Sequence, residues 1–184
     1  ALTMGYAAFP GEALAEGHSG AMISPNMFFD IHADGRVVVH IAKAEMGQHV
    51  GTALAQTVAE ELECGWDKVD IAYVGFDPRH GLHITGGSWS VNWTFDALSR
   101  AGAAGRIALI ELAAAELGGA PEDYTAKDGV ISGNGKSISY GDLARMGGTP
   151  RAFTEDEMKA LTLKGNGERS IVGQSVAALD IPAK

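Results

Sequence analysis

The stretch Lys43-Ala-Glu-Met-Gly-Gln-His-Val-Gly51 separates a strand-like run of the chain from a helix-like run. Its centre, Met46-Gly47-Gln48, predicts a turn, because glycine adopts backbone conformations that other residues avoid. A helix that begins directly after a turn points unpaired backbone N–H groups, and the positive end of its dipole, at whatever lies in front of it. We therefore expect this turn to hold an anionic group such as a phosphate. A second turn of small residues, Thr85-Gly86-Gly87-Ser88, is expected to close over the same ligand.

Strand and helix patterns flank the first turn. Apolar residues alternate in residues 27–33 and 36–42, and Asp34-Gly35 between them predicts a tight hairpin turn. Residues 50–65 repeat apolar side chains every four positions, which predicts an amphipathic helix, and residues 69–73 predict another strand. This order predicts an α+β fold, with a mixed or antiparallel sheet and helices packed on one face.

The second half of the chain begins with a long predicted helix from about Ser90 to Leu117. Gly102 and Gly105 lie within it, and two helix-weakening glycines in a good helical pattern indicate that another backbone packs closely there. Turn signals in residues 124–140 predict a small meander. Ser139 resembles a capping residue for a short helix at residues 142–146.

These patterns divide the chain into three parts. Residues 1–25 are expected to be a flexible N-terminus, and the apolar Ala1–Pro10 resembles either the remnant of an export signal or an ordinary terminus. Residues 26–147 are expected to form the α+β domain. Residues 148–184 mix charge, glycine and isolated apolar residues, which predicts a linker or extended arm toward a following domain.

The composition excludes several classes of partner and site. The 184 residues are 46% apolar, enough for one core, and the net charge of −9 disfavours nucleic acid and anionic membrane surfaces as partners. The single Cys64 cannot form an internal disulfide, a four-cysteine zinc site or an iron–sulfur cluster by itself. No run approaches the roughly 18 apolar residues that a membrane-spanning helix needs.

Some candidate residues have more ordinary explanations. Asp77, His80 and His83 are possible metal ligands, but their spacing is common by chance in exposed loops. Trp89 and Trp93 either line a substrate entrance or, as we favour, anchor the start of the helix. Glu60-Glu61 is expected to be a solvated helix face. His32 and His40 are expected to be surface residues.

One set of residues, taken in order, carries a family resemblance: Met46-Gly47-Gln48, Glu60-Glu61-Leu62, Thr85-Gly86-Gly87-Ser88 and the segment 140–144 (Tyr-Gly-Asp-Leu-Ala). Together they resemble the leading part of the large, molybdopterin-binding subunit of the xanthine dehydrogenase and aldehyde oxidase family. The isoquinoline 1-oxidoreductase branch is the one most resembled, and the similarity runs from about Asn26 to Lys184. The ending 168–184 resembles the lead-in to that subunit's next domain.

The resemblance implies a molybdenum hydroxylase that oxidises an aldehyde or an N-heteroaromatic substrate with oxygen derived from water. It implies molybdopterin, in the cytosine dinucleotide form common in bacterial relatives, and electron transfer to 2Fe-2S clusters in a small partner subunit. It also favours a periplasmic location, with the cytoplasm as the alternative. The residues that it assigns to the pterin or its phosphate tail are Met46, Gly47, Gln48, Thr85, Gly86, Gly87, Ser88 and Ser90.

Two departures from the family pattern limit this reading. His49 stands where the family often has glycine, which would alter the turn or place a side chain over the cofactor. The family's catalytic glutamate lies in a downstream motif that nothing in this chain matches. We therefore expect the chain to be catalytically incomplete without the remainder of the large subunit. The alternative is a non-catalytic module that binds a phosphate-bearing small molecule or a partner protein.

Overall fold

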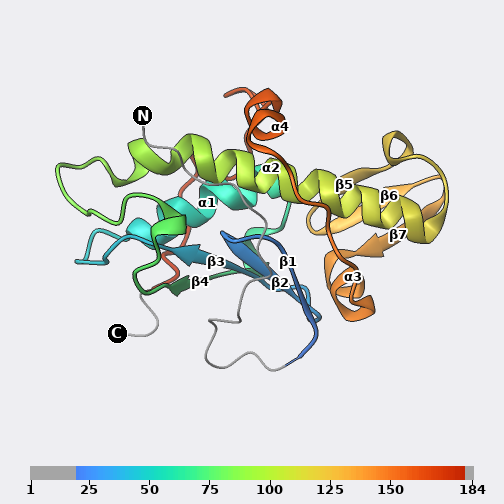
Figure 1. The fold of residues 1–184 in the computed structure, drawn as a ribbon, viewed down its shortest axis with the longest axis horizontal. Coiled ribbons are helices and arrows are strands. Elements are labelled where there is room, and N and C mark those ends of the chain that lie inside the picture. Colours follow the sequence, from blue (N-terminus) through green and yellow to red (C-terminus); the bar gives the residue numbers. More distant parts are fainter. Residues whose placement is uncertain (1–19, 181–184) are drawn as a thin grey trace.

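The computed structural model describes residues 20–180, and its central feature is a four-stranded sheet (Figure 1). The first two strand pairs are antiparallel and the last pair is parallel, so the sheet is mixed. The strands lie in chain order, as β1 (Met22–Asn26), β2 (Phe29–His32), β3 (Val37–Ile41) and β4 (Val69–Tyr73). The predicted α+β class is confirmed, and β1 is a strand that the sequence pattern did not indicate.

Helix α1 (Val50–Leu62) connects β3 to the parallel strand β4. A parallel pair needs such a crossover, and the helix packs back on the sheet. Close packing of α1 on the sheet explains why position 51 is a glycine. A Cβ atom on Gly51 would lie 2.7 Å from the Tyr73 hydroxyl and 2.8 Å from Ile71 Cδ1. The short 3-10 helix η1 (Trp66–Lys68) leads from α1 into β4.

Helix α2 (Ser90–Leu117) has the predicted bounds and lies beside α1 on the same face of the sheet (Figure 1). The two helices touch at Gly102, where a Cβ atom would lie 2.6 Å from the Val58 carbonyl oxygen. At Gly105 a Cβ atom would lie 2.5 Å from the Phe29 ring. The expected close approach of another backbone is confirmed at Gly102, and Gly105 makes room for a ring of the sheet.

Gly102→Ala is expected to lower the free energy of unfolding by about 1–3 kcal/mol, because the added methyl group overpacks the contact with Val58. Alanine would be favoured at this position in an isolated helix, so the packing cost must exceed that preference. Urea denaturation followed by circular dichroism measures the change. The matched control is Ala115, which is exposed on the same helix. There Ala115→Gly is expected to lower the free energy of unfolding by about 1 kcal/mol. Alanine is thus the more stable residue at position 115, whereas glycine is expected to be the more stable residue at position 102. A Gly102→Ala variant more stable than wild type would contradict this account.

A small meander follows α2, as predicted. The 3-10 helix η3 (Pro121–Asp123) leads into β5 (Thr125–Lys127), β6 (Val130–Gly133) and β7 (Lys136–Ser139), which form a separate antiparallel sheet. Helix α3 (Tyr140–Met146) then begins two residues earlier than expected, although Ser139 caps it as predicted by accepting a hydrogen bond from the Asp142 amide. The buried Tyr140 hydroxyl donates to the Leu62 carbonyl oxygen at 2.6 Å and so joins this unit to the end of α1.

The chain then forms helix α4 (Glu155–Ala160), which the sequence pattern did not predict, and returns along α1. Glu60 receives this returning segment: its carboxylate accepts hydrogen bonds from the amides of Ser170, Ile171 and Val172. Lys164 adds a salt bridge to Glu60 at 2.9 Å. The expectation that Glu60-Glu61 is a solvated face is therefore wrong, since both residues are buried.

Within residues 20–180 there is no helix with the length and apolar character that crossing a membrane requires. The possible export-signal remnant Ala1–Pro10 lies outside the described residues, as does most of the segment 1–25. The same holds for residues 181–184 at the other end of the chain.

Candidate functional site

The two predicted turns lie next to each other at the carboxyl ends of β3 and β4. The Ala44 amide, two residues before Met46, donates a hydrogen bond to the Thr85 hydroxyl at 2.8 Å. A groove of about 440 Å³ opens beside this contact, lined by residues 41–45 at and just after the end of β3, by Tyr73 and Val74 at the end of β4, and by His83. Ligands of open sheets with parallel strands commonly bind at this edge.

The first turn is held by the side chain of Gln48. Its carbonyl oxygen accepts from the Met46 amide at 2.5 Å, and its amide nitrogen donates to the Ala44 carbonyl at 2.8 Å. Gly47 has φ +96°, a conformation that favours glycine. Met46, Gly47 and Gln48 are all exposed, so the turn is preformed and still accessible.

The amino terminus of α1 is occupied by Glu45. This carboxylate accepts from the amides of Gly47 at 2.5 Å, His49 at 3.1 Å and Val50 at 3.0 Å. Burial raises the pKa of Glu45, but these backbone hydrogen bonds outweigh it and leave the pKa below its usual value. The expectation that the first amides of α1 face a ligand is therefore wrong for Val50, the first residue of the helix, because the chain supplies its own anion there. Glu45 was missed from the sequence, although an acidic residue just before a helix is a recognised signal.

His49 does not project over the turn as a free side chain. Its Nδ1 lies 2.9 Å from the Asp180 carboxylate, and its backbone has φ +57°. Glu45, His49 and Asp180 form the one group of possible metal ligands among residues 20–180, with ligand atoms within 4.8 Å of one another. Asp77, His80 and His83 do not form such a group in that part of the chain. The Asp77 carboxylate pairs with Arg79 instead.

The second turn, Thr85 to Ser88, is open. Gly87 and Ser88 both have φ +60°, and the amides of Gly86, Gly87 and Ser88 have no hydrogen-bond partner among the described residues. Consecutive amides in turn conformations form concavities that bind anions. A Cβ atom on Gly86 would meet nothing within 4 Å, and its φ is not positive. Neither packing nor backbone conformation within the chain requires a glycine at position 86.

Helix α2 begins directly behind this turn, and its amino terminus is open. Its N-cap residue, Trp89, makes no side-chain capping bond, and the first turn contains no acidic residue. Ser90, the first residue of the helix, is partly exposed. The positive end of a 28-residue helix is thus available beside the free amides of Gly86 to Ser88.

Large apolar side chains are exposed on the loops around the two turns. Trp89 and Trp93 stack on each other with ring centres 5.7 Å apart, and both are about half exposed. The other large exposed side chains on these loops are Met46, Phe76 and Ile84. Exposed apolar groups gathered near one site commonly mark a surface that another segment or molecule covers.

A buried ion pair lies behind the groove, between β2 and β3. His40 Nε2 is 2.9 Å from the Asp30 carboxylate, and His40 Nδ1 is 2.9 Å from the Met27 carbonyl oxygen. A carbonyl oxygen and an ionised carboxylate are both acceptors, so this arrangement favours the protonated imidazole, in which both ring nitrogens donate. Burial lowers the pKa of His40, but the hydrogen bond to Asp30 and its charge raise it further, so the net shift is upward. The expectation that His32 and His40 are surface residues is wrong, because both are buried.

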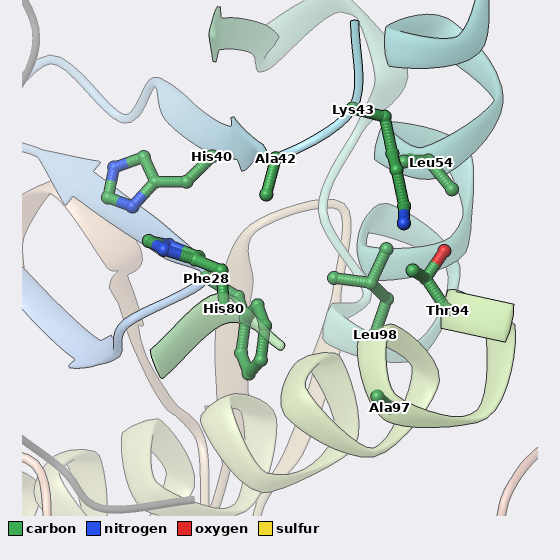
Figure 2. Close-up of a pocket in the computed structure, with 9 residues that line it drawn as sticks. All are labelled: Phe28, His40, Ala42, Lys43, Leu54, His80, Thr94, Ala97 and Leu98. Atoms are coloured by element: carbon green, nitrogen blue, oxygen red, sulfur yellow. The ribbon is translucent and has the colours of Figure 1, made fainter. Parts of the chain in front are cut away.

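The pKa of the neighbouring buried His80 is shifted in the opposite direction. Its Nε2 lies 3.3 Å from the same Met27 carbonyl oxygen, while its Nδ1 has no partner among the described residues. Burial lowers the pKa of His80, and the positive charge of His40 acts in the same direction. Figure 2 shows the rings of His40 and His80 next to each other, in an edge-to-face arrangement, at one end of a small cavity, with Phe28 between them and α2.

The stability contribution of His40 is expected to fall as the pH rises. Its pKa is higher in the folded than in the unfolded chain, so the contribution is complete below about pH 6.5, the unfolded value, and is lost as the pH rises through the folded pKa. The difference in free energy of unfolding between wild type and His40→Gln should therefore shrink between pH 6 and pH 9. Urea denaturation at several pH values measures this difference. Asp30→Asn, which removes the negative partner, should abolish most of the pH dependence, and a difference independent of pH would refute the charged pair.

Comparison with known protein families finds one domain model that covers most of the chain. Residues 5–170 match the molybdopterin cofactor-binding domain. The match includes both turns and the helices that follow them.

Two curated proteins show the extent of similarity. The chain is 48% identical over 161 residues to the membrane-bound aldehyde dehydrogenase [pyrroloquinoline-quinone] of Gluconacetobacter polyoxogenes, which covers 87% of this chain and 21% of that protein. It is 31% identical over 152 residues to the isoquinoline 1-oxidoreductase subunit beta of Brevundimonas diminuta, covering 78% of this chain and 20% of that one. The chain thus spans about a fifth of the length of these relatives.

Among solved structures, the Cu,Mo-CO dehydrogenase in its carbon monoxide reduced state has a similar fold. The TM-score is 0.53 with 24% identity, over 67% of this chain and 17% of that chain.

Proposed function

The chain belongs to the family of molybdopterin cofactor-binding domains, and from this premise we propose that its two turns hold the cofactor of a molybdenum-dependent oxidoreductase. One contact supports this proposal above all: the hydrogen bond from the Ala44 amide to Thr85, which joins the two turns beside the groove. All the residues assigned to the cofactor lie on these turns or, for Ser90, at the start of α2.

The residues present fit a ligand with a polar ring system and an anionic tail. The second turn offers the free amides of Gly86, Gly87 and Ser88, the hydroxyls of Thr85, Ser88 and Ser90, and the open end of α2. These groups suit a phosphate. The first turn offers the exposed edge of Gln48, which can donate and accept hydrogen bonds to a heterocycle.

When bound, the molybdenum–pterin group supplies two-electron oxidation of the substrate with oxygen derived from water. This chain contributes binding and orientation. The Gln48 side chain fixes the shape of the first turn, the Ala44–Thr85 bond sets the distance to the second turn, and Glu45 keeps competing anions away from the start of α1. The chain supplies no residue that we assign to proton transfer at the substrate.

We extend the proposal to the assembly around the chain. The site requires the remainder of a longer large subunit, which would cover the exposed apolar residues around the turns, and a small subunit with 2Fe-2S clusters that accepts the electrons. We propose an aldehyde or an N-heteroaromatic compound as substrate, the cytosine dinucleotide form of the cofactor and a periplasmic location. The names of the relatives above support the substrate classes.

The name of one relative supports a second candidate. The aldehyde dehydrogenase that is 48% identical carries pyrroloquinoline quinone in its name. This quinone is also an anionic heterocycle, and the same free amides and helix end would suit its carboxylates. In this alternative the chain would bind a prosthetic group without molybdenum.

Analysis of the purified longer polypeptide distinguishes these candidates. We expect about one molybdenum atom and one extractable pterin per polypeptide. Pyrroloquinoline quinone without molybdenum or pterin would favour the second candidate, and the absence of all three from a fully matured complex would refute both.

Gly86→Val is expected to abolish retention of the cofactor while leaving the stability of the chain unchanged. The new Cβ atom would meet nothing within 4 Å and the backbone φ at position 86 is not positive, so we expect the side chain to affect mainly what approaches the turn from outside. The readouts are molybdenum and pterin content of the longer polypeptide, and the urea midpoint of the chain. Gly167→Val is the matched control, because Gly167 has the same open surroundings but lies on the returning segment. Equal cofactor content in both variants would contradict the assignment of the second turn.

A further inference from the structure

Lys43 is a buried lysine that joins the two turns. It lies two residues after the end of β3, and only 3% of its surface is exposed. Its ammonium group donates hydrogen bonds to the carbonyl oxygen of Leu82 and, at 3.1 Å, to that of Ile84. Both acceptors lie in the loop that leads into Thr85. The side chain therefore spans from the first turn to the second through the interior of the protein.

The ammonium group of Lys43 interacts with carbonyl oxygens and an aromatic ring, and not with an opposite charge, among the described residues. The Trp93 ring centre lies 5.8 Å from Nζ, a cation–π distance, and no carboxylate pairs with Lys43 among residues 20–180. Figure 2 shows the side chain reaching from the end of β3 toward Thr94 and Leu98 on α2. Burial lowers the pKa of Lys43. A buried ammonium held by two carbonyls and a ring is a poor choice for stability alone, since an apolar side chain of similar length would fill the space without desolvating a charge.

We propose that Lys43 is a positioning residue for the cofactor site, whose ammonium group clamps the loop at residues 82–84 and so sets the spacing between the turns at 46–48 and 85–88. The inference rests on the proposed function of these turns. The clamp works together with the Ala44–Thr85 bond, which lies one residue further along each segment. The Lys43 hydrogen bonds and the Ala44–Thr85 hydrogen bond together fix both the distance and the orientation of the second turn. The exposed Ala44–Thr85 bond alone would leave the turn free to rotate.

The Ala44 amide provides a direct reporter of the clamp, because Thr85 protects it from exchange only while the loop is docked. In Lys43→Met we expect hydrogen exchange of the Ala44 amide, measured by NMR, to accelerate by about tenfold or more, the loss expected when hydrogen bonds to a charged group are removed. The urea midpoint should stay equal or rise, since a charge has been replaced by an apolar group. Lys43→Arg, which keeps the charge and the donors, should restore slow exchange.

The matched control is Lys164→Met. Lys164 is also a largely buried lysine, but it pairs with Glu60 and Glu63 at the far end of α1. Its loss should lower stability and leave Ala44 exchange unchanged. A purely structural role for Lys43 would give the same pattern as Lys164, with stability falling and the loop unaffected, and that result would overturn the proposal.

Cofactor content of the longer polypeptide completes the test. We expect Lys43→Met to retain less than about one fifth of the wild-type molybdenum and pterin, the loss that a tenfold weaker site would cause near half saturation, and Lys43→Arg to recover most of it. Full retention in Lys43→Met would overturn the positioning role. Wild-type polypeptide that lacks both molybdenum and pterin would refute the proposed function instead, while the Ala44 exchange result would still decide whether Lys43 clamps the loop.

If Lys43→Met fails to fold, the wild-type chain still tests the clamp. Acetylation followed by mass spectrometry should modify Lys43 at least about tenfold more slowly than Lys68 and Lys159, whose side chains are more than half exposed. Equal labelling rates would show that the ammonium group is not held inside the protein and would overturn the proposal.

Discussion

The parallel pairing of β3 with β4 is the constraint from which the site follows. Two parallel strands end at the same edge, so the segment after β3 and the segment after β4 leave the sheet side by side. The first segment forms the turn at residues 46–48 and the second returns through the loop that contains Leu82, Ile84 and Thr85. Antiparallel pairing would have sent the two turns to opposite edges. The crossover helix α1 enforces the parallel order, and its packing depends on close approaches at Gly51 and Gly102.

The two turns are built differently, although both are rich in small residues. Around the first turn, the amides of Met46, Gly47 and Val50 donate to the side chains of Gln48 or Glu45. The amides of Gly86, Gly87 and Ser88 have no partner within residues 20–180, and the amino-terminal end of α2 has no side-chain cap there. The chain as a whole carries a charge of −9, so an anion at the second turn would have to be attracted locally by oriented dipoles rather than by net charge. A rigid first turn and an unsatisfied second turn together suit a ligand whose two ends differ in polarity.

Sequence patterns predicted the elements of this fold well where local signals and packing agree. The bounds of α2 followed from its Ala-rich run and the Gly-Pro stop, and the cap at Ser139 followed from a local motif. The proximity of the two turns was also anticipated, although only a family resemblance gave them a role. Long-range contacts lie outside such signals. Glu60 was expected to be solvated but is buried because a segment 110 residues further along the chain covers it, and Lys43, for which the sequence pattern made no prediction, is buried because a loop about 40 residues away folds over it. No local periodicity contains that information.

The buried charges differ in how they are satisfied, and the difference separates structural groups from site groups. Burial raises the pKa of Glu60, but Lys164 and three backbone amides outweigh it and bring the pKa to about 2, as for a carboxylate that fixes a returning segment. His40 and Asp30 satisfy each other within the sheet. Lys43 has no such counter-ion among the described residues, and its partners are two carbonyls of the loop that carries the second turn. A buried charge without an opposite charge is costly. Lys43 lies between the two turns, where the proposed site needs a fixed geometry. Proteins commonly tolerate such locally unfavourable groups at functional sites.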